Sequence, residues 1–163
     1  RTETLKNYEL SFTMKLAREW RPGGGWKSII HIGDTNGHRL PGIWFHESSN
    51  ALHVMHSMAG RLAYDAQWGV WVTTGPEFTA GETYDIRVVV KSNQMTVYVD
   101  GVSAGTASGS MTYVAKNAAV YVGDPWYDAA KVTLSDIRLK DTEKAPLDKT
   151  DEAPAAPLAE EEA

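Results

Sequence analysis

The stretch from Thr83 to Val102 places the strongest constraint on the fold, because two runs alternate apolar and polar residues around a short polar break. If Ser92 and Asn93 form a two-residue turn, the apolar residues of the two runs meet on one face. This register pairs Lys91 with Gln94, Val90 with Met95, Val88 with Val97 and Ile86 with Val99. A slip of one residue would scatter the match, so the pattern predicts a β-meander that turns again at Asp100-Gly101.

Further short segments carry strand patterns bounded by turn residues, and no segment has a convincing 3.6-residue apolar period. We therefore predict an all-β sandwich. The expected strands outside the first hairpin are Tyr8 to Leu16, Trp26 to Ile32, Ile43 to His46, Ala51 to Met55, one or two strands within Leu62 to Val72, Ser103 to Thr106, Val120 to Val122 and Lys131 to Leu139.

Charge divides the chain into two parts. Residues 141–163 hold eight acids and two lysines, whereas residues 1–140 hold 13 acids and 14 bases. We expect residues 1–140 to form one domain and residues 141–163 to form a disordered acidic Ala/Pro-rich tail, serving as a solvated linker or docking to a basic partner. A nearly neutral body without a basic stripe argues against nucleic-acid binding.

The sequence also limits compartment and membrane insertion. It holds no cysteine, and no apolar run approaches the length of a transmembrane segment. It starts at Arg1 instead of Met, so we expect the chain to begin inside a longer reading frame. An exported, extracellular or luminal location is favoured over a cytoplasmic one.

The order of several motifs resembles the laminin G-like domains of the concanavalin A-like lectin/glucanase superfamily. The resemblance covers roughly residues 5 to 140. It rests on PGIWF at 41–45, LHV at 52–54, TYDIR at 83–87, MTVYVDG at 95–101, VYVGDPWY at 120–127 and VTLSDIRL at 132–139. It implies a jelly roll of two antiparallel sheets, one of them concave.

A hairpin around residues 43–54 is the first candidate site. A four-residue loop would pair Phe45 with Leu52 and Ile43 with Val54 on the core face. Trp44, His46 and His53 would then share the opposite face, where an aromatic plane beside polar donors suits a sugar. Trp68 and Trp71 would extend this surface. The alternative is an aromatic–imidazole pair that only shields the hairpin.

The loop Asp124-Pro125-Trp126-Tyr127 is the second candidate, since Asp followed by Pro favours a tight turn. It would either cover the open end of the sandwich with Trp126 or present Trp126 and Tyr127 to a ligand. Asp34, Asn36 and Asp124 offer loop oxygen atoms that some relatives use for calcium, although no family calcium motif matches them.

Catalytic patterns are not found in the sequence. No strand carries two carboxylates at alternate positions, and no nucleophile elbow occurs. All five histidines lie between His31 and His56, but His46 and His53 alone are too few ligands for zinc. We therefore expect a non-catalytic module that binds glycans or protein partners. The alternative is a structural subunit packed into a larger assembly.

Overall fold

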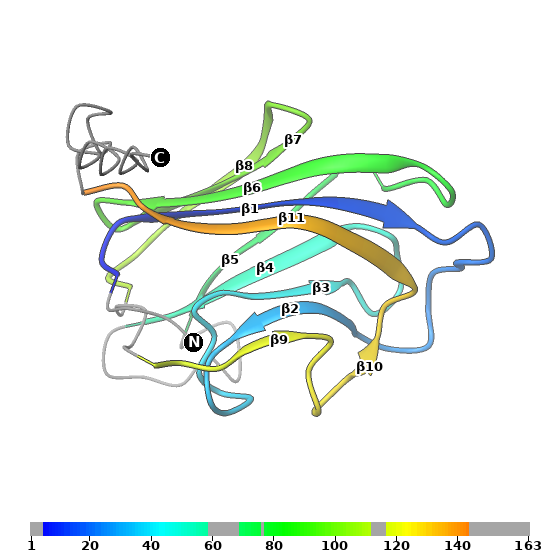
Figure 1. The fold of residues 1–163 in the computed structure, drawn as a ribbon, viewed down its shortest axis with the longest axis horizontal. Helices are drawn as coiled ribbons and strands as arrows, with labels where there is room; N and C mark the ends of the chain where they lie inside the picture. Colours follow the sequence, from blue (N-terminus) through cyan, green and yellow to red (C-terminus); the bar gives the residue numbers. More distant parts are fainter. Residues whose placement is uncertain (1–4, 59–68, 76, 112–116, 144–163) are drawn as a thin grey trace, which may run out of the picture.

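The computed structural model describes residues 5–58, 69–75, 77–111 and 117–143. Eleven β-strands in these residues form two sheets that lie face to face (Figure 1). The five-stranded sheet has the order β11 (Val132–Asp141), β1 (Tyr8–Leu16), β6 (Thr83–Lys91), β7 (Gln94–Val99) and β8 (Val102–Ser108). The six-stranded sheet has the order β10 (Asp128–Ala129), β2 (Lys27–Ile32), β3 (Gly42–Phe45), β4 (Leu52–Ser57) and β5 (Gly69–Thr73), with β9 (Val120–Val122) also paired to β2. The all-β sandwich is confirmed.

The register predicted for the central hairpin is confirmed in full. All four predicted pairs, from Lys91–Gln94 to Ile86–Val99, are found between β6 and β7. Ser92 and Asn93 have φ angles of 52° and 61°, and Asp100 and Gly101 have φ angles of 49° and 80°. Positive φ at both central residues is what a two-residue hairpin turn requires, so both turns reverse the chain where the sequence predicts.

The strand β1 lies between β11 and β6 in the five-stranded sheet. It pairs with β6 on one side and with β11 on the other, antiparallel in both cases. The pairing with β11 is interrupted by a bulge between Ser11 and Thr13. A strand near the start of the chain is therefore held by two strands that come far later in the sequence.

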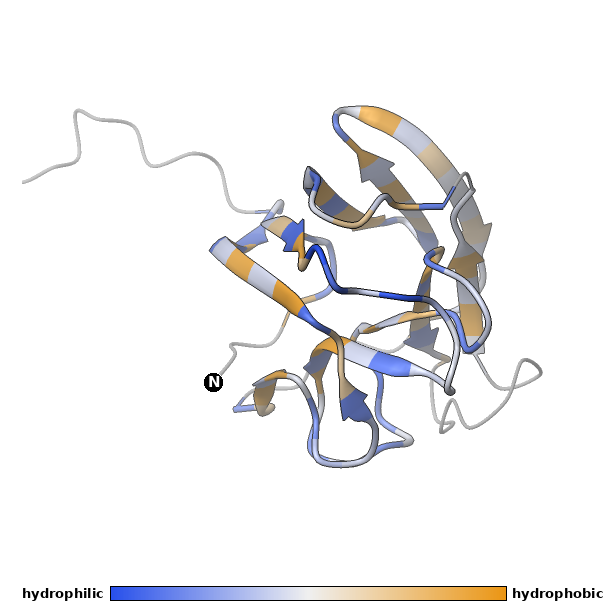
Figure 2. Cartoon of the chain, turned by 90° about the vertical axis from the view of Figure 1, so that its right-hand side faces the viewer, coloured by the Kyte–Doolittle hydropathy of each residue, from blue (hydrophilic) through white to orange (hydrophobic). Residues whose placement is uncertain are grey.

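The core consists of the apolar residues that alternate along the strands and point between the sheets. Figure 2 shows this alternation as bands of orange and blue along the strands. Twelve large side chains are almost fully buried: Tyr8, Leu10, Met14, Leu16, Ile29, Ile30, Ile32, Ile43, Phe45, Leu52, Ile86 and Met95. Burial of an apolar side chain of this size contributes roughly 1.5–3 kcal/mol, so this layer is the main source of stability.

Strand ends differ modestly from the sequence predictions. β4 extends two residues further than expected, β11 continues to Asp141, and the short β10 was not predicted. β5 begins at Gly69, and the earlier part of the predicted Leu62–Val72 segment lies outside the described residues, as does nearly all of the acidic tail. Within the described residues no helix is long and apolar enough to cross a membrane.

Candidate functional site

The outer face of the six-stranded sheet carries the candidate hairpin. β3 and β4 pair Phe45 with Leu52, Trp44 with His53 and Ile43 with Val54, which confirms the predicted register. Alternation then sends Trp44, His53 and Met55 away from the core, while Phe45, Leu52 and Val54 point into it. On β5, Trp71 is paired with Met55 and Thr73 with His53, so Trp71 and Thr73 share this outer face.

Trp44 lies on this face but is not exposed, which corrects the expectation that its indole is an open plane for a ligand. Only 2% of its surface is accessible. With Met55 it forms a small second cluster, against which Trp26 and Tyr127 pack. Its ring lies so close to Gly42 that only a residue without Cβ fits beneath it. The outer face is thus covered at its centre by a second apolar layer.

Arg39 fixes this second layer. Its guanidinium carbon lies 4.7 Å from the centroid of the Trp44 ring, a cation–π arrangement. Its Nη1 donates to the sulfur of Met55 at 3.0 Å, and its Nη2 donates to the hydroxyl of Tyr127 at 3.3 Å. Its Nε donates to the carbonyl of Asn36 at 3.0 Å. This buried arginine therefore joins the loop before β3, the sheet and the loop that follows β9.

Three rings lie close together on this face, and we call Trp26, His46 and His53 the ring cluster. The Trp26 ring centroid lies 4.8 Å from those of both His46 and His53. All three side chains are half-buried. Trp71, with 42% of its surface exposed, lies on the same face beyond Met55. Aromatic planes and imidazole nitrogens are thus available here to a molecule from solvent.

The two imidazoles of the ring cluster are held by neighbouring groups. His46 Nδ1 accepts a hydrogen bond from the backbone N–H of Ser48 at 3.4 Å, and His53 Nδ1 lies 2.9 Å from the hydroxyl of Thr73. Burial, followed by the nearby His46 and Arg39, lowers the pKa of His53 to about 4. His53 is therefore neutral at pH 7.

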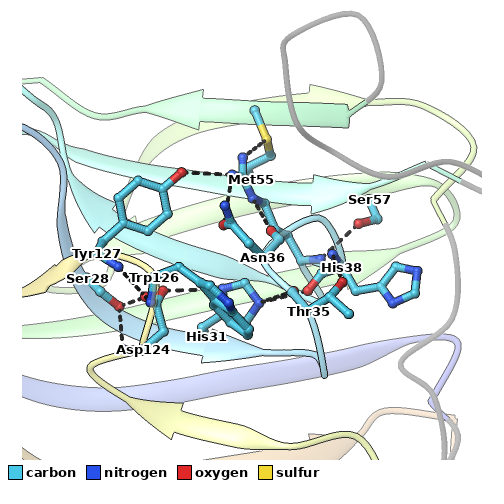
Figure 3. Close-up of polar contacts among 11 residues, drawn as sticks. Ser28, His31, Thr35, Asn36, His38, Met55, Ser57, Asp124, Trp126 and Tyr127 are labelled. Atoms are coloured by element: carbon cyan, nitrogen blue, oxygen red, sulfur yellow. Dashed lines mark hydrogen bonds and ion pairs between the residues drawn. The ribbon is translucent and has the colours of Figure 1, made fainter.

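The Asp124–Tyr127 loop is anchored on the same sheet (Figure 3). Asp124 Oδ1 accepts hydrogen bonds from the backbone N–H groups of Trp126 and Tyr127 at 3.0 and 2.9 Å. Its Oδ2 accepts the Ser28 hydroxyl at 3.0 Å, and Ser28 Oγ in turn accepts the N–H of Asp124. Both oxygens of this buried carboxylate are thus used to hold the turn against β2.

His31 completes this anchor. Its Nε2 lies 3.1 Å from the carbonyl oxygen of Thr35 and 2.8 Å from that of His38, so Nε2 must carry the proton and donate. Its Nδ1 lies 3.5 Å from Asp124 Oδ2. Burial lowers the pKa of His31, while the charge of Asp124 raises it in part. The ring of Trp126 packs on that of His31, with centroids 4.9 Å apart.

The structure brings the two candidate sites together. The rings of Trp44 and Tyr127 are 5.7 Å apart and nearly perpendicular. Trp126 is 36% exposed, and its ring packs against those of His31 and Tyr121. Trp68 lies outside the described residues. The sequence pattern does not single out Trp26 or Arg39. Their importance follows only from contacts with residues that are distant in the sequence.

The three proposed calcium ligands are all engaged by the protein. Asp34 Oδ1 accepts the N–H of Ala119 at 3.0 Å, and the carbonyl of Asn36 accepts from Arg39. The carboxylate of Asp124 accepts hydrogen bonds from Ser28, Trp126 and Tyr127. In the part of the chain that the structure describes, no three His, Cys, Asp or Glu side chains are grouped to hold a metal ion. Calcium binding at Asp34, Asn36 and Asp124 stays a prediction.

A hollow lies on the five-stranded sheet. It has a volume of about 340 Å³, and its lining includes Asp85, Arg87, Asp136 and Arg138. Asp85 accepts the hydroxyl of Thr13 at 2.9 Å, and both aspartates are exposed. The lining thus combines two exposed aspartates with two arginines.

Comparison with known proteins identifies the fold. The family model described as the concanavalin A-like lectin/glucanases superfamily, a laminin G group, matches residues 4–145. No curated protein sequence matches the chain. A Trypanosoma rangeli sialidase in complex with sialic acid is similar over 82% of this chain and 20% of its own, with 17% identity and a TM-score of 0.58. The chain thus spans about one fifth of that sialidase.

Two smaller proteins match over most of their own length. The carbohydrate-binding module CBM66 of Bacillus subtilis is 8% identical, with 86% of this chain and 78% of the module covered and a TM-score of 0.55. Sheep galectin-11, solved with glycerol, is 12% identical, with 86% and 95% covered and a TM-score of 0.52. At these identities the likeness concerns the fold.

Proposed function

The chain belongs to the concanavalin A-like lectin/glucanases superfamily, and from this premise we propose that it is a non-catalytic module that binds carbohydrate. The observation that carries the proposal is the half-buried ring cluster on the outer face of the six-stranded sheet. A sugar presents an apolar C–H face and a rim of hydroxyls, so it needs an aromatic plane beside polar groups. Trp26 and Trp71 offer the planes, while His46, His53 and Thr73 offer the polar groups.

Two structural neighbours support the proposal. CBM66 is a carbohydrate-binding module, and galectin-11 shares its architecture with this chain over nearly its whole length. The sialidase likeness covers only 20% of that enzyme, so it is a poor guide to catalysis in this chain. A fold of this kind hosts many functions, and the proposal therefore rests on the ring cluster.

A glycan array probed with the full chain tests the proposal, followed by titration calorimetry with the strongest ligand. Trp26→Ala and Trp71→Ala should each weaken binding by about tenfold, which corresponds to a loss of 1.4 kcal/mol. The matched control is Tyr98→Ala, which removes a half-buried aromatic residue from the five-stranded sheet. Unchanged affinity in both tryptophan variants would remove the ring cluster from the proposal.

A second candidate function is docking to a protein partner within an assembly. The observation that favours it is a set of exposed apolar residues beside the Asp124 loop. Val120 and Val122 of β9 are 41% and 61% exposed, and Trp126 is 36% exposed. Exposed apolar patches of this kind mark protein interaction sites. Co-purification of a stoichiometric partner that is lost in Val122→Asp, with glycan binding absent, would favour this function.

A further inference from the structure

The strand β9 forms an edge of the six-stranded sheet (Figure 1). Its residues Val120–Val122 pair with Ile30–Ile32 of β2 in an antiparallel register. No second strand of the described residues pairs with β9. An edge strand presents unpaired backbone N–H and C=O groups, so its open side can template the addition of a further strand.

The hydrogen bonds at the two ends of β9 show which backbone groups are open. The carbonyl of Ala119 accepts from the residue after β2, and the N–H of Gly123 donates to β2. In an antiparallel ladder this orientation alternates along the strand, so Tyr121 also directs its N–H and C=O toward β2. The N–H and C=O groups of Val120 and Val122 therefore point away from the sheet.

The side chains of the same two valines are apolar and exposed. Val120 is 41% exposed and Val122 is 61% exposed. Both are paired with buried isoleucines of β2, so they continue the inner face of the sheet. Tyr121 points to the outer face, where its ring packs against that of Trp126 with centroids 5.5 Å apart. Open backbone groups and exposed apolar side chains thus coincide on β9.

Charge and irregular pairing protect the two edges of the five-stranded sheet. β11 exposes Arg138 and Lys140, and its pairing with β1 is interrupted by the bulge between Ser11 and Thr13. The pairing of β8 with β7 shifts register as well. Charged side chains and bulges hinder the pairing of edge strands. β9 has neither feature, since its three residues are uncharged and pair with β2 without a shift.

We propose that β9 pairs with β9 of a second copy of the chain, antiparallel about a two-fold axis at Tyr121. In this register Val120 of each copy faces Val122 of the other. Each of these two pairs exchanges both backbone hydrogen bonds, so every open group of β9 is used. Valine meets valine, tyrosine meets tyrosine, and no charge meets a charge. This self-complementarity assigns a second copy, in an isologous contact, instead of another protein.

The contact is short, which sets its strength. Three residues of each copy form the paired strands. Interfaces that bury less than about 1,200 Å² are typical of weak and transient complexes. We therefore expect an equilibrium between monomer and dimer, with the monomer predominating in dilute solution.

The pairing also determines how two ring clusters would be presented. Residues that face each other in a ladder lie on the same face of the sheet, so Tyr121 of both copies marks one shared outer face. Two ring clusters would then point to the same side and engage a glycan-bearing surface together, which raises avidity. This consequence rests on the carbohydrate-binding function proposed above, whereas the pairing itself does not.

Sedimentation equilibrium of the full chain without ligand, from about 5 µM to about 500 µM, tests the pairing. We expect the apparent mass to rise from that of a monomer toward that of a dimer. Val122→Lys should weaken dimerisation at least about tenfold, because it places a charge opposite Val120 of the second copy. Val102→Lys is the matched control, since Val102 is 69% exposed on β8 of the other sheet. A chain that stays monomeric throughout, or a dimer that survives Val122→Lys, overturns the proposal.

A mixture of two variants tests the register. Val120→Asp alone should also be monomeric. When it is mixed with Val122→Lys, the introduced carboxylate faces the introduced ammonium group, so dimers with one copy of each variant should form. Tyr121→Cys gives a second readout, because opposite residues at this non-hydrogen-bonded position have Cα atoms about 4.5 Å apart, within reach of a disulfide. The natural chain has no cysteine, so any cross-link must join the two introduced thiols.

The outcomes separate this inference from the proposed function. A wild-type dimer that shows neither the restored mixed dimer nor the cross-link overturns the pairing through β9. Dimerisation in a chain that binds no glycan leaves the pairing standing and removes the proposed function. Glycan binding by a chain that is monomeric throughout does the reverse.

Discussion

A Cβ atom at Gly42 would lie 2.0 Å from Cη2 of Trp44, well inside van der Waals contact. The missing side chain at Gly42 is what lets the indole lie flat on β3, with Arg39 above it. The indole of Trp44 thus fills the space that a side chain at Gly42 would occupy.

Gly42→Ala should displace Trp44 and destabilise the fold by about 1–3 kcal/mol, because overpacking forces the indole out of its position. Urea unfolding measures the loss, and near-UV circular dichroism reports the changed environment of Trp44. Gly75→Ala is the control, since nothing lies within 4 Å of the added Cβ there. Equal stability of the two variants would contradict the tight fit.

Asp124→Ala should loosen the loop that carries Trp126 and Tyr127. The carboxylate accepts two backbone N–H groups and the hydroxyl of Ser28, so its removal leaves buried donors unpaired, at a cost of about 1–3 kcal/mol. Amide hydrogen exchange should accelerate at Trp126 and Tyr127 while the amides of β6 and β7 stay protected. Asp124→Asn keeps the shape and one acceptor and should cost less.

Acid should destabilise the fold through its neutral buried histidines. Burial lowers the pKa of His56 to about 4, and its Nδ1 donates to the carbonyl of Ser57 at 3.0 Å. Since the folded pKa lies below the unfolded value of about 6.5, this contribution is complete above pH 6.5 and is lost as the pH falls toward 4. The expected loss is on the order of 3 kcal/mol.

Urea unfolding at pH 7 and pH 4.5 measures this effect. His56→Gln should flatten the pH dependence, because glutamine does not titrate. His38→Gln is the control, since His38 is an exposed histidine. A His56→Gln curve as steep as that of the wild type would show that other groups, such as the carboxylates, cause the acid sensitivity.

Ser92→Val should weaken the central hairpin. Ser92 adopts a φ of 52°, a left-handed conformation that costs a β-branched residue about 1–2 kcal/mol. The backbone N–H of Ser92 donates to Oδ1 of Asn7, and this N–H is retained in both Ser92→Val and Ser92→Gly. Ser92→Gly, which tolerates positive φ, should be close to neutral. Thermal unfolding compares the two, and equal melting temperatures would contradict the turn assignment.

Calcium binding at Asp34, Asn36 and Asp124 predicts a melting temperature that falls on addition of EDTA and recovers with calcium. Asp34→Asn should then abolish the shift, because it removes one of the two carboxylate charges of the set. A melting temperature that does not respond to either addition would end the calcium hypothesis.

Local periodicity explains how much of the fold the sequence predicts. The two hairpins, Ile86–Val99 and Ile43–Val54, follow from alternation and short turns, so their registers could be predicted residue by residue. The ring cluster could not be predicted, because Trp26 precedes β2 and meets His46 and His53 only through the folded sheet. Alternation places Trp44 on the outer face correctly, but it contains no information on whether other loops cover that face.

The position of β1 between β6 and β11 has a consequence during synthesis. A ribosome makes the chain from its N-terminus, so Tyr8–Leu16 emerges long before Thr83–Lys91 and Val132–Asp141 exist. The nascent β1 therefore has both rows of backbone hydrogen-bonding groups open to other strands, in a chain dominated by nonlocal pairings that form slowly. The ring cluster is subject to the same delay, because the second layer beneath it needs Tyr127. A nascent chain thus acquires its candidate binding face only after Tyr127 has been synthesised.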